Sequence, residues 1–183
     1  MREKRINTHS LAFAAITGAA YAVLTIALAP ISYGAVQFRI SEALCILPFF
    51  IPDTAAGLFI GCLAANIMTG NVFDIIFGSL ATLLAGICTA LTGRMGRSAA
   101  VKLLACLPPV IINALVVGAV ITGAYNGMSI TGHMGIYLIN ALQVGAGEAA
   151  VMYALGFPLM LYLPRKAFFT ELINKTENRR RDR

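Results

Sequence analysis

The chain has 183 residues, of which 58% are hydrophobic and 12% charged, and its mean hydropathy is +0.80. A soluble domain is typically about 25% charged, so this composition excludes an ordinary soluble enzyme or binding domain and predicts an all-α integral membrane protein. The net charge of +6 arises from basic residues at the two ends and in one short loop. That distribution is typical of membrane-topology signals rather than of nucleic-acid binding.

The first predicted span covers residues 11–29. Its apolar run follows a basic start, as in a signal peptide, but it is longer than a usual signal core and predicts an uncleaved span. Small residues recur four apart, as in the pairs Ala15 and Ala19, and Ala14 and Gly18. This spacing allows another helix to approach closely, and it leaves open whether that helix belongs to the same chain or to a partner.

Residues 30–42 form a short polar stretch between two apolar ones. Pro30 and Gly34 break the helix that precedes them, the first by lacking an N–H and the second by its backbone freedom. Gln37, Arg39 and Glu42 then supply an amide, a guanidinium and a carboxylate. Such groups beside hydrocarbon are costly unless they meet each other, water or a ligand. Two interpretations follow: a surface loop with a local Arg39–Glu42 ion pair, or part of a polar-ligand site at the membrane face.

Five further spans are predicted along the chain. The second and third are separated by the turn signal Pro52-Asp53, although a helix over the second would rise only about 20 Å, less than the roughly 30 Å hydrocarbon core. The predicted spans after the first cover residues 40–52, 54–70, 74–91, 103–122 and 135–164.

Charge supports six spans over five. With six spans and a cytoplasmic N-terminus, the basic loop at 94–102 and the tail both lie inside, and Arg39 alone of the 14 Lys and Arg residues lies outside. Fusing the second and third spans would place that loop and the tail outside, against the positive-inside rule. We therefore predict a cytoplasmic N-terminus (1–10), a six-helix transmembrane domain (11–164) and a basic cytoplasmic tail (165–183), which favours anionic lipid over nucleic acid as its neighbour.

Several polar residues fall inside the apolar segments. In the six-span arrangement five of them lie near one outer-facing level: Gln37, Arg39, Glu42, Asn66 and Asp74. On the sixth helix Tyr137, Asn140 and Glu148 share one face, within about 80°. Hydrogen bonds between packed helices account for Asn and Gln in such places, here including Asn113 and Gln143. They account less well for Glu148, because an ionisable side chain at mid-membrane is functional by default.

Signals of enzymatic chemistry are weak in this sequence. His9 and His133 are predicted on opposite sides of the membrane, and the four cysteines lack metal-ligand spacing and are interpreted as small apolar residues. The run Gly93–Ser98 has neither the lysine nor the spacing of a phosphate-binding loop. We therefore expect no catalytic residues, metal or cofactor. These features favour a substrate-capturing subunit that is powered by other proteins.

The polar stretch and its flanks carry a family resemblance. Residues 28–44, which include Gln37-Phe-Arg-Ile-Ser-Glu42, and the following Leu47-Pro-Phe-Phe50 resemble the signature of the QueT family. These proteins are substrate-binding (S) components of energy-coupling factor (ECF) transporters and are associated with the uptake of queuosine precursors. The resemblance covers roughly residues 10–163 and leaves the tail unmatched. Further matching segments are Gly57–Cys62 with Asn66, Asp74–Leu84, Pro109–Asn113 and Gly147-Glu148.

The resemblance implies a six-helix S component in the cell membrane, without enzymatic activity of its own. Ala15 and Ala19 match the family's small-residue contact motif for the ECF transmembrane coupling subunit, which is driven by two cytoplasmic ATPase subunits. The implied ligand is a 7-deazaguanine, whose base-edge donors suit a carboxylate and whose carbonyl suits an amide or guanidinium. The candidate substrate-binding residues are Gln37, Arg39, Glu42, Asn66, Asp74, Asn113 and Glu148.

Two other functions stay open on the sequence. One is an S component for another vitamin or aromatic small molecule, because related S components recognise chemically different vitamins. The other is a stand-alone small-solute permease, which would transport its solute without ATPase subunits.

Overall fold

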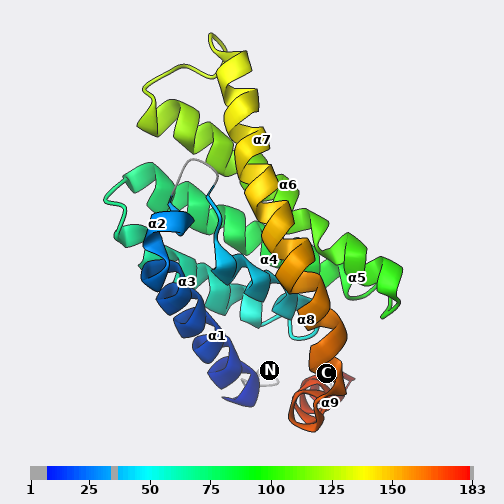
Figure 1. The fold of residues 1–183 in the computed structure, drawn as a ribbon. Coiled ribbons are helices and arrows are strands. Elements are labelled where there is room, and N and C mark those ends of the chain that lie inside the picture. Colours follow the sequence, from blue (N-terminus) through cyan, green and yellow to red (C-terminus); the bar gives the residue numbers. More distant parts are fainter. Residues whose placement is uncertain (1–7, 34–36, 182–183) are drawn as a thin grey trace, which may run out of the picture.

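The structure is a computed structural model that describes residues 8–33 and 37–181, with side chains described up to residue 176. Every regular element in these ranges is helical, as Figure 1 shows, which confirms the predicted all-α class. The principal elements in chain order are α1 (Thr8–Ala27), α2 (Ala29–Ser32), η1 (Ile40–Phe49), α3 (Thr54–Ile67), η2 (Asp74–Gly78), α4 (Ser79–Thr92), α5 (Ala99–Ala105), α6 (Leu107–Val120), η3 (Ile121–Tyr125), α7 (Met134–Val151), η4 (Met152–Gly156), α8 (Phe157–Tyr162), η5 (Leu163–Arg165) and α9 (Ala167–Arg181).

Four helical stretches of the described chain are long and apolar enough to cross a membrane. They correspond to the predicted first, fourth, fifth and sixth spans and cover Thr8–Ala27, Asp74–Thr92, Ala99–Tyr125 and Met134–Arg165. The predicted second and third spans form two shorter apolar helices, Ile40–Phe49 and Thr54–Thr69, with the predicted break between them. Six complete spans and the side of each terminus stay predictions.

The second predicted segment forms the buried centre of the bundle. It is η1, a 3₁₀-helix of 10 residues with Pro48 inside. At about 2 Å per residue such a helix is only about 20 Å long. Most of its side chains are buried on every side, against α1, α3, α4 and η4. A helix that is apolar all round belongs in an interior, so η1 carries its polar residues into the protein rather than toward lipid.

Helices α1 and α3 pack backbone against backbone. A Cβ atom added at Gly18 would lie 2.3 Å from the carbonyl oxygen of Gly57, and one added at Gly57 would lie 2.0 Å from that of Ala14. No side chain fits at these positions, so the small residues are required for the approach. Ala15 and Ala19 lie beside this contact face and are exposed. The small residues of α1 therefore form two groups: Ala14 and Gly18 contact α3, and Ala15 and Ala19 are exposed on the helix surface.

Among the described residues, π-helical segments occur within two of the longer helical stretches, at η2 and η4, and at the end of a third, at η3. Such segments are frequent at functional sites, and η2 begins with the buried Asp74. Within η2, a Cβ atom on Gly78 would lie 2.9 Å from Nδ2 of Asn66 and 3.1 Å from Oδ1 of Asp74. The glycine thus leaves room for two polar side chains beside the helix.

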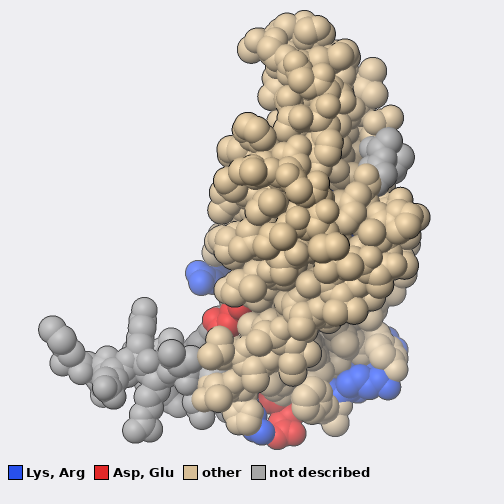
Figure 2. Space-filling model, turned by 90° about the vertical axis from the view of Figure 1, so that its left-hand side faces the viewer, with Lys and Arg blue, Asp and Glu red and all other residues tan. Residues whose placement is uncertain are grey.

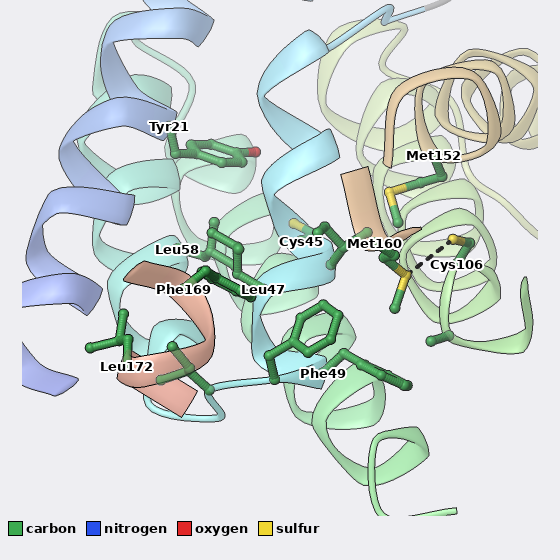
Figure 3. Close-up of a cluster of buried hydrophobic side chains, with 14 of the residues drawn as sticks. Tyr21, Cys45, Leu47, Phe49, Leu58, Cys106, Met152, Met160, Phe169 and Leu172 are labelled. Carbon is green, nitrogen blue, oxygen red and sulfur yellow. Dashed lines mark hydrogen bonds between the residues drawn. The ribbon is translucent and has the colours of Figure 1, made fainter. Parts of the chain in front are cut away.

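A cluster of apolar side chains holds the lower end of the bundle together (Figure 3). Phe50 of the turn after η1 meets Phe169 of α9 edge to face, with 5.4 Å between ring centroids. Leu172, one turn farther along α9, is also buried. The first half of the predicted tail is therefore a helix packed on the bundle and not a free extension.

Charged side chains gather at that same end. In the face shown in Figure 2, Lys, Arg, Asp and Glu lie in the lower part and the upper part shows none among the described residues. Helix α1 begins and α8 ends at this lower end in Figure 1. The carboxylates and guanidinium inside the bundle are buried and so do not appear on the surface.

Candidate ligand-binding site

Arg39 connects the start of η1 to the start of η2. Its side chain is buried, and Nη2 lies 3.9 Å from Oδ1 of Asp74. Nε donates a hydrogen bond of 3.3 Å to the carbonyl oxygen of Ser32, and the guanidinium lies over the Tyr33 ring, 5.3 Å from its centroid. Among the described residues, Arg39 therefore forms its ion pair with Asp74 and not with Glu42. Because Arg39 and Glu42 are also buried, the interpretation as a surface loop with a local Arg39–Glu42 pair is wrong.

Glu42 is held by two neighbours. The hydroxyl of Tyr21 on α1 donates to Oε1, and the thiol of Cys45, one turn along η1, donates to Oε2 at 2.9 Å. All three residues are at most 1% exposed. Both carboxylate oxygens thus have protein partners, which fixes the orientation of this side chain.

The thiol of Cys62 on α3 lies between the Glu42 and Asp74 regions. Its sulfur lies 3.6 Å from the hydroxyl of Tyr21, 3.4 Å from Nδ2 of Asn66 and 3.3 Å from Oγ1 of Thr82. Asn66 also donates through Nδ2 to the backbone carbonyl oxygen of Asp74 at 3.1 Å. A continuous chain of polar contacts therefore runs from α1 through α3 to η2.

Glu148 enters the same region from α7. Nδ2 of Asn113, on α6, donates to its Oε1 at 2.7 Å, and both residues are 3% exposed. Glu148 also lies within electrostatic range of Glu42 and Arg39. Helices α6 and α7 thus add a third carboxylate near the cluster.

Gln37 is buried at the edge of the cluster. Its φ of 47° is left-handed, a conformation that costs a non-glycine residue roughly 1–2 kcal/mol. Its carbonyl oxygen accepts a 2.9 Å hydrogen bond from the backbone N–H of Arg39. Such strain clusters at functional sites. Residues 34–36 of the predicted signature, with the predicted helix break at Gly34, lie outside the described residues.

Several buried polar atoms of this region have no hydrogen-bond partner among the described residues. Leaving such an atom unpaired costs about 1–3 kcal/mol, so the set indicates a place that a polar ligand or water completes. The atoms are Oγ of Ser32, Nη2 of Arg39, Oδ1 of Asn66, both carboxylate oxygens of Asp74, Oγ of Ser79 and Oε2 of Glu148.

The cluster contains more carboxyl groups than cationic groups. Three buried carboxylates, those of Glu42, Asp74 and Glu148, face the single guanidinium of Arg39 among the described residues. No group of three or more His, Cys, Asp or Glu side chains in the described chain is placed to hold a metal ion. An excess of carboxylates favours a ligand with several hydrogen-bond donors and a positive charge.

The structure joins four of the predicted site residues, Arg39, Glu42, Asn66 and Asp74, through connected contacts. Asn113 and Glu148 form a separate hydrogen-bonded pair that interacts electrostatically with Glu42 and Arg39. Gln37 is buried, and its described hydrogen bond is to the backbone of Arg39. Their role in binding a substrate stays a prediction. The residues that sequence reasoning missed are Tyr21, Ser32, Cys45, Cys62, Ser79 and Thr82.

Other polar residues of the predicted spans lie apart from this cluster. Asn140 donates to Oγ1 of Thr122 at 2.9 Å, and the hydroxyl of Tyr137 donates to the carbonyl oxygen of Leu115 at 3.4 Å. These are hydrogen bonds between packed helices. Gln143 is exposed on the outside of α7. The shared face predicted for Tyr137, Asn140 and Glu148 therefore contributes only Glu148 to the cluster.

The described helices, four of them long and apolar enough to cross a membrane, are those of an all-α, multi-pass membrane protein, and a buried cluster of incompletely paired polar groups lies inside them. The model of the family described as QueT transporter matches residues 11–165. The chain belongs to this family, which confirms the resemblance read from residues 28–50. Members are transporters and not enzymes.

One curated relative is the "Queuosine precursor transporter QueT" of Lactococcus lactis subsp. cremoris (strain MG1363). It is 38% identical over 82 residues, which are 44% of this chain and 48% of the relative. The match thus spans about half the length of that protein. No solved structure matches the chain.

Proposed function

We propose that the chain is the substrate-binding S component of an ECF-type ABC importer, which captures a queuosine precursor outside the cell. The observation that carries this proposal is the buried polar cluster, in which several atoms have no hydrogen-bond partner among the described residues. The membership of the chain in the QueT transporter family supports it. The name of the Lactococcus relative supports the substrate class. Bound ligand then passes to the coupling module and through it into the cytoplasm.

The cluster suits a 7-deazaguanine base. Its edge presents N1–H and N2–H₂ donors beside a carbonyl acceptor, and a carboxylate takes both donors while a guanidinium serves the carbonyl. Asp74 has two carboxylate oxygens without hydrogen-bond partners, and Arg39 beside it has a donor group without one. Burial of these groups strengthens each hydrogen bond that a ligand makes with them.

The outward face of α1 suits a partner helix. Ala15 and Ala19 are exposed on α1, whereas Ala14 and Gly18 beside them pack against α3 within the chain. Two exposed alanines four residues apart allow the backbone of another helix to come close. The partner in this proposal is the transmembrane coupling subunit, and two ATPase subunits attached to it supply the energy.

The orientation that fits this function places both termini in the cytoplasm. The end of the bundle that carries the charged side chains in Figure 2 then faces inward, as the positive-inside rule requires. In this arrangement the protein is a multi-pass component of the cell membrane, and Arg39 and Asp74 lie toward the outer side.

Two measurements test the proposal. Titration calorimetry of the purified chain with 7-aminomethyl-7-deazaguanine should show saturable binding, while an unrelated vitamin such as riboflavin should give no heat beyond dilution. Proteoliposomes that contain the chain alone should not accumulate radiolabelled ligand, whereas those that also contain the coupling and ATPase subunits should do so with ATP. Uptake by the chain alone would identify a stand-alone permease, and preference for another vitamin would identify a different S component.

A further inference from the structure

The three buried carboxylates differ in how many of their oxygens have no hydrogen bond to the described part of the protein and so can accept one from a ligand. Both oxygens of Glu42 accept hydrogen bonds from protein groups. Glu148 has one oxygen bonded to Asn113 and one without a partner, and Asp74 has neither oxygen bonded. Because each carboxylate oxygen is a separate acceptor, the three side chains are suited to different tasks. Glu42 is a positioning residue, and the other two remain for ligand groups.

Asp74 is suited to a neutral, two-donor edge. A pair of parallel N–H groups requires both oxygens of one carboxylate. Among the three, only Asp74 has two oxygens without a geometrically defined hydrogen bond in the described chain, with the Tyr125 hydroxyl interacting with the same carboxylate. Its negative charge is already offset by Arg39, whose Nη2 lies 3.9 Å from Oδ1. Nη2 of Arg39 has no hydrogen-bond partner among the described residues, so it can donate to a ligand carbonyl that lies next to the N–H bound by Oδ1. Along the base edge the carbonyl would then face Nη2, N1–H would face Oδ1 and N2–H₂ would face Oδ2.

Glu148 is suited to a cation. It is 3% exposed, and no lysine or arginine of the described chain forms an ion pair with it. Asn113 fixes Oε1 at 2.7 Å, which leaves Oε2 as a single acceptor. A buried carboxylate that lacks a counter-charge is costly, and one ammonium group would supply both the hydrogen bond and the charge.

We infer that the site recognises two separate parts of its ligand. Asp74 and Arg39 bind the base edge, and Glu148 binds a cationic aminomethyl group. This assignment rests on the proposed function, because it takes a 7-deazaguanine as the ligand. It goes further by making Glu148 the specificity-determining residue for the positive charge. The site therefore prefers 7-aminomethyl-7-deazaguanine to the neutral 7-cyano-7-deazaguanine.

The test compares these two ligands by calorimetry on the parent chain and on two variants. Glu148→Gln keeps the shape but removes the charge. It should weaken the aminomethyl ligand about 10- to 100-fold, the value of a charge-assisted hydrogen bond, and leave the cyano ligand within about twofold of the parent. Asp74→Asn should weaken both ligands by similar factors. Glu171→Gln, at an exposed carboxylate on α9, is the control and should change neither.

The outcomes separate the assignment from the function. If Glu148→Gln weakens both ligands equally or weakens neither, the two-part assignment is overturned while the deazaguanine function stands. If the parent binds neither ligand, the function itself fails and the assignment with it. Parental binding of the cyano ligand also shows that Glu148→Gln is folded. Should that variant not purify, Asn113→Ala, which frees the Glu148 side chain, must weaken the aminomethyl ligand more than the cyano ligand, and equal weakening contradicts the assignment.

Discussion

Arg39 and Asp74 form a buried ion pair in which Nη2 lies 3.9 Å from Oδ1, with the two side chains 4% and 1% exposed. At this separation the two groups attract each other but do not share a hydrogen bond. Both therefore keep capacity for a third molecule. A buried pair is weak evidence for stability, because desolvation offsets most of the attraction. Its place at the junction of η1 and η2 instead points to ligand binding.

The first prediction separates these two roles. Arg39→Gln and Asp74→Asn each leave one charge of the pair behind and should lower the melting temperature of the purified protein. The double variant removes both charges and should recover much of that loss in stability. It should still bind 7-aminomethyl-7-deazaguanine at least tenfold more weakly than the parent in calorimetry. Parental affinity in the double variant would show that the pair is structural only.

The second prediction concerns the contact between α1 and α3. Gly57→Ala places a Cβ atom 2.0 Å from the Ala14 carbonyl oxygen, so the helices must separate. Overpacking costs typically about 1–3 kcal/mol, and we expect a lower melting temperature. The matched control is Gly135→Ala, where an added Cβ atom meets nothing within 4 Å. Equal melting temperatures for the two variants would contradict the close backbone contact.

The third prediction concerns Tyr21, which holds Glu42 in place. Tyr21→Phe removes the hydroxyl that donates to Oε1 of Glu42 and leaves a buried carboxylate oxygen unpaired, at a cost of about 1–3 kcal/mol. Thermal unfolding should show this loss. Tyr137→Phe is the control, because its hydroxyl makes a longer bond of 3.4 Å near the surface of the bundle. A Tyr21 variant as stable as this control would mean that the Glu42 contact contributes nothing.

Much of this architecture is readable from the sequence because its signals are local. Apolar length predicts the long helices, and the turn at Pro52-Asp53 predicts the break before α3. The burial of η1 on all sides depends on which helices surround it, and no local pattern carries that information. The same limit explains why the long-range Arg39–Asp74 pair was not foreseen beside the nearer Glu42.

Sequence reasoning found those residues of the cluster whose side chains are rare in membrane segments and missed those that are common there. Charged and amide side chains such as Glu148 and Asn66 stand out against an apolar run. Tyr21, Cys45 and Cys62 do not, because tyrosine and cysteine also serve as ordinary apolar residues. Cys106 does so here, packed against Met160 (Figure 3), whereas Cys62 contacts polar groups of α1, α3 and α4. Only three-dimensional neighbours separate these two uses.

The fourth prediction tests the outward face of α1. Ala15→Phe or Ala19→Phe adds bulk on the exposed side and should block a partner helix without disturbing the bundle. Uptake of labelled ligand by cells should fall at least tenfold, while the purified variant binds the ligand as the parent does. Leu142→Phe, a substitution at a 72% exposed position on α7, is the control for added bulk away from α1. Loss of binding together with uptake would place these alanines in internal packing.

The last prediction is the topology, which rests on the distribution of the 14 Lys and Arg residues and on the charged end seen in Figure 2. Ser129→Cys lies in the loop between η3 and α7, and Met95→Cys lies in the loop between α4 and α5, at a side chain 65% exposed. With cytoplasmic termini and six spans, an impermeant maleimide on intact cells should label the first variant alone and label the second only after permeabilisation. Both variants are made in a Cys88→Ala background, because Cys88 is partly exposed whereas Cys45, Cys62 and Cys106 are buried. The Cys88→Ala chain without an added cysteine is the control and should not be labelled. Labelling of both variants on intact cells would contradict an arrangement in which these two loops lie on opposite sides of the membrane.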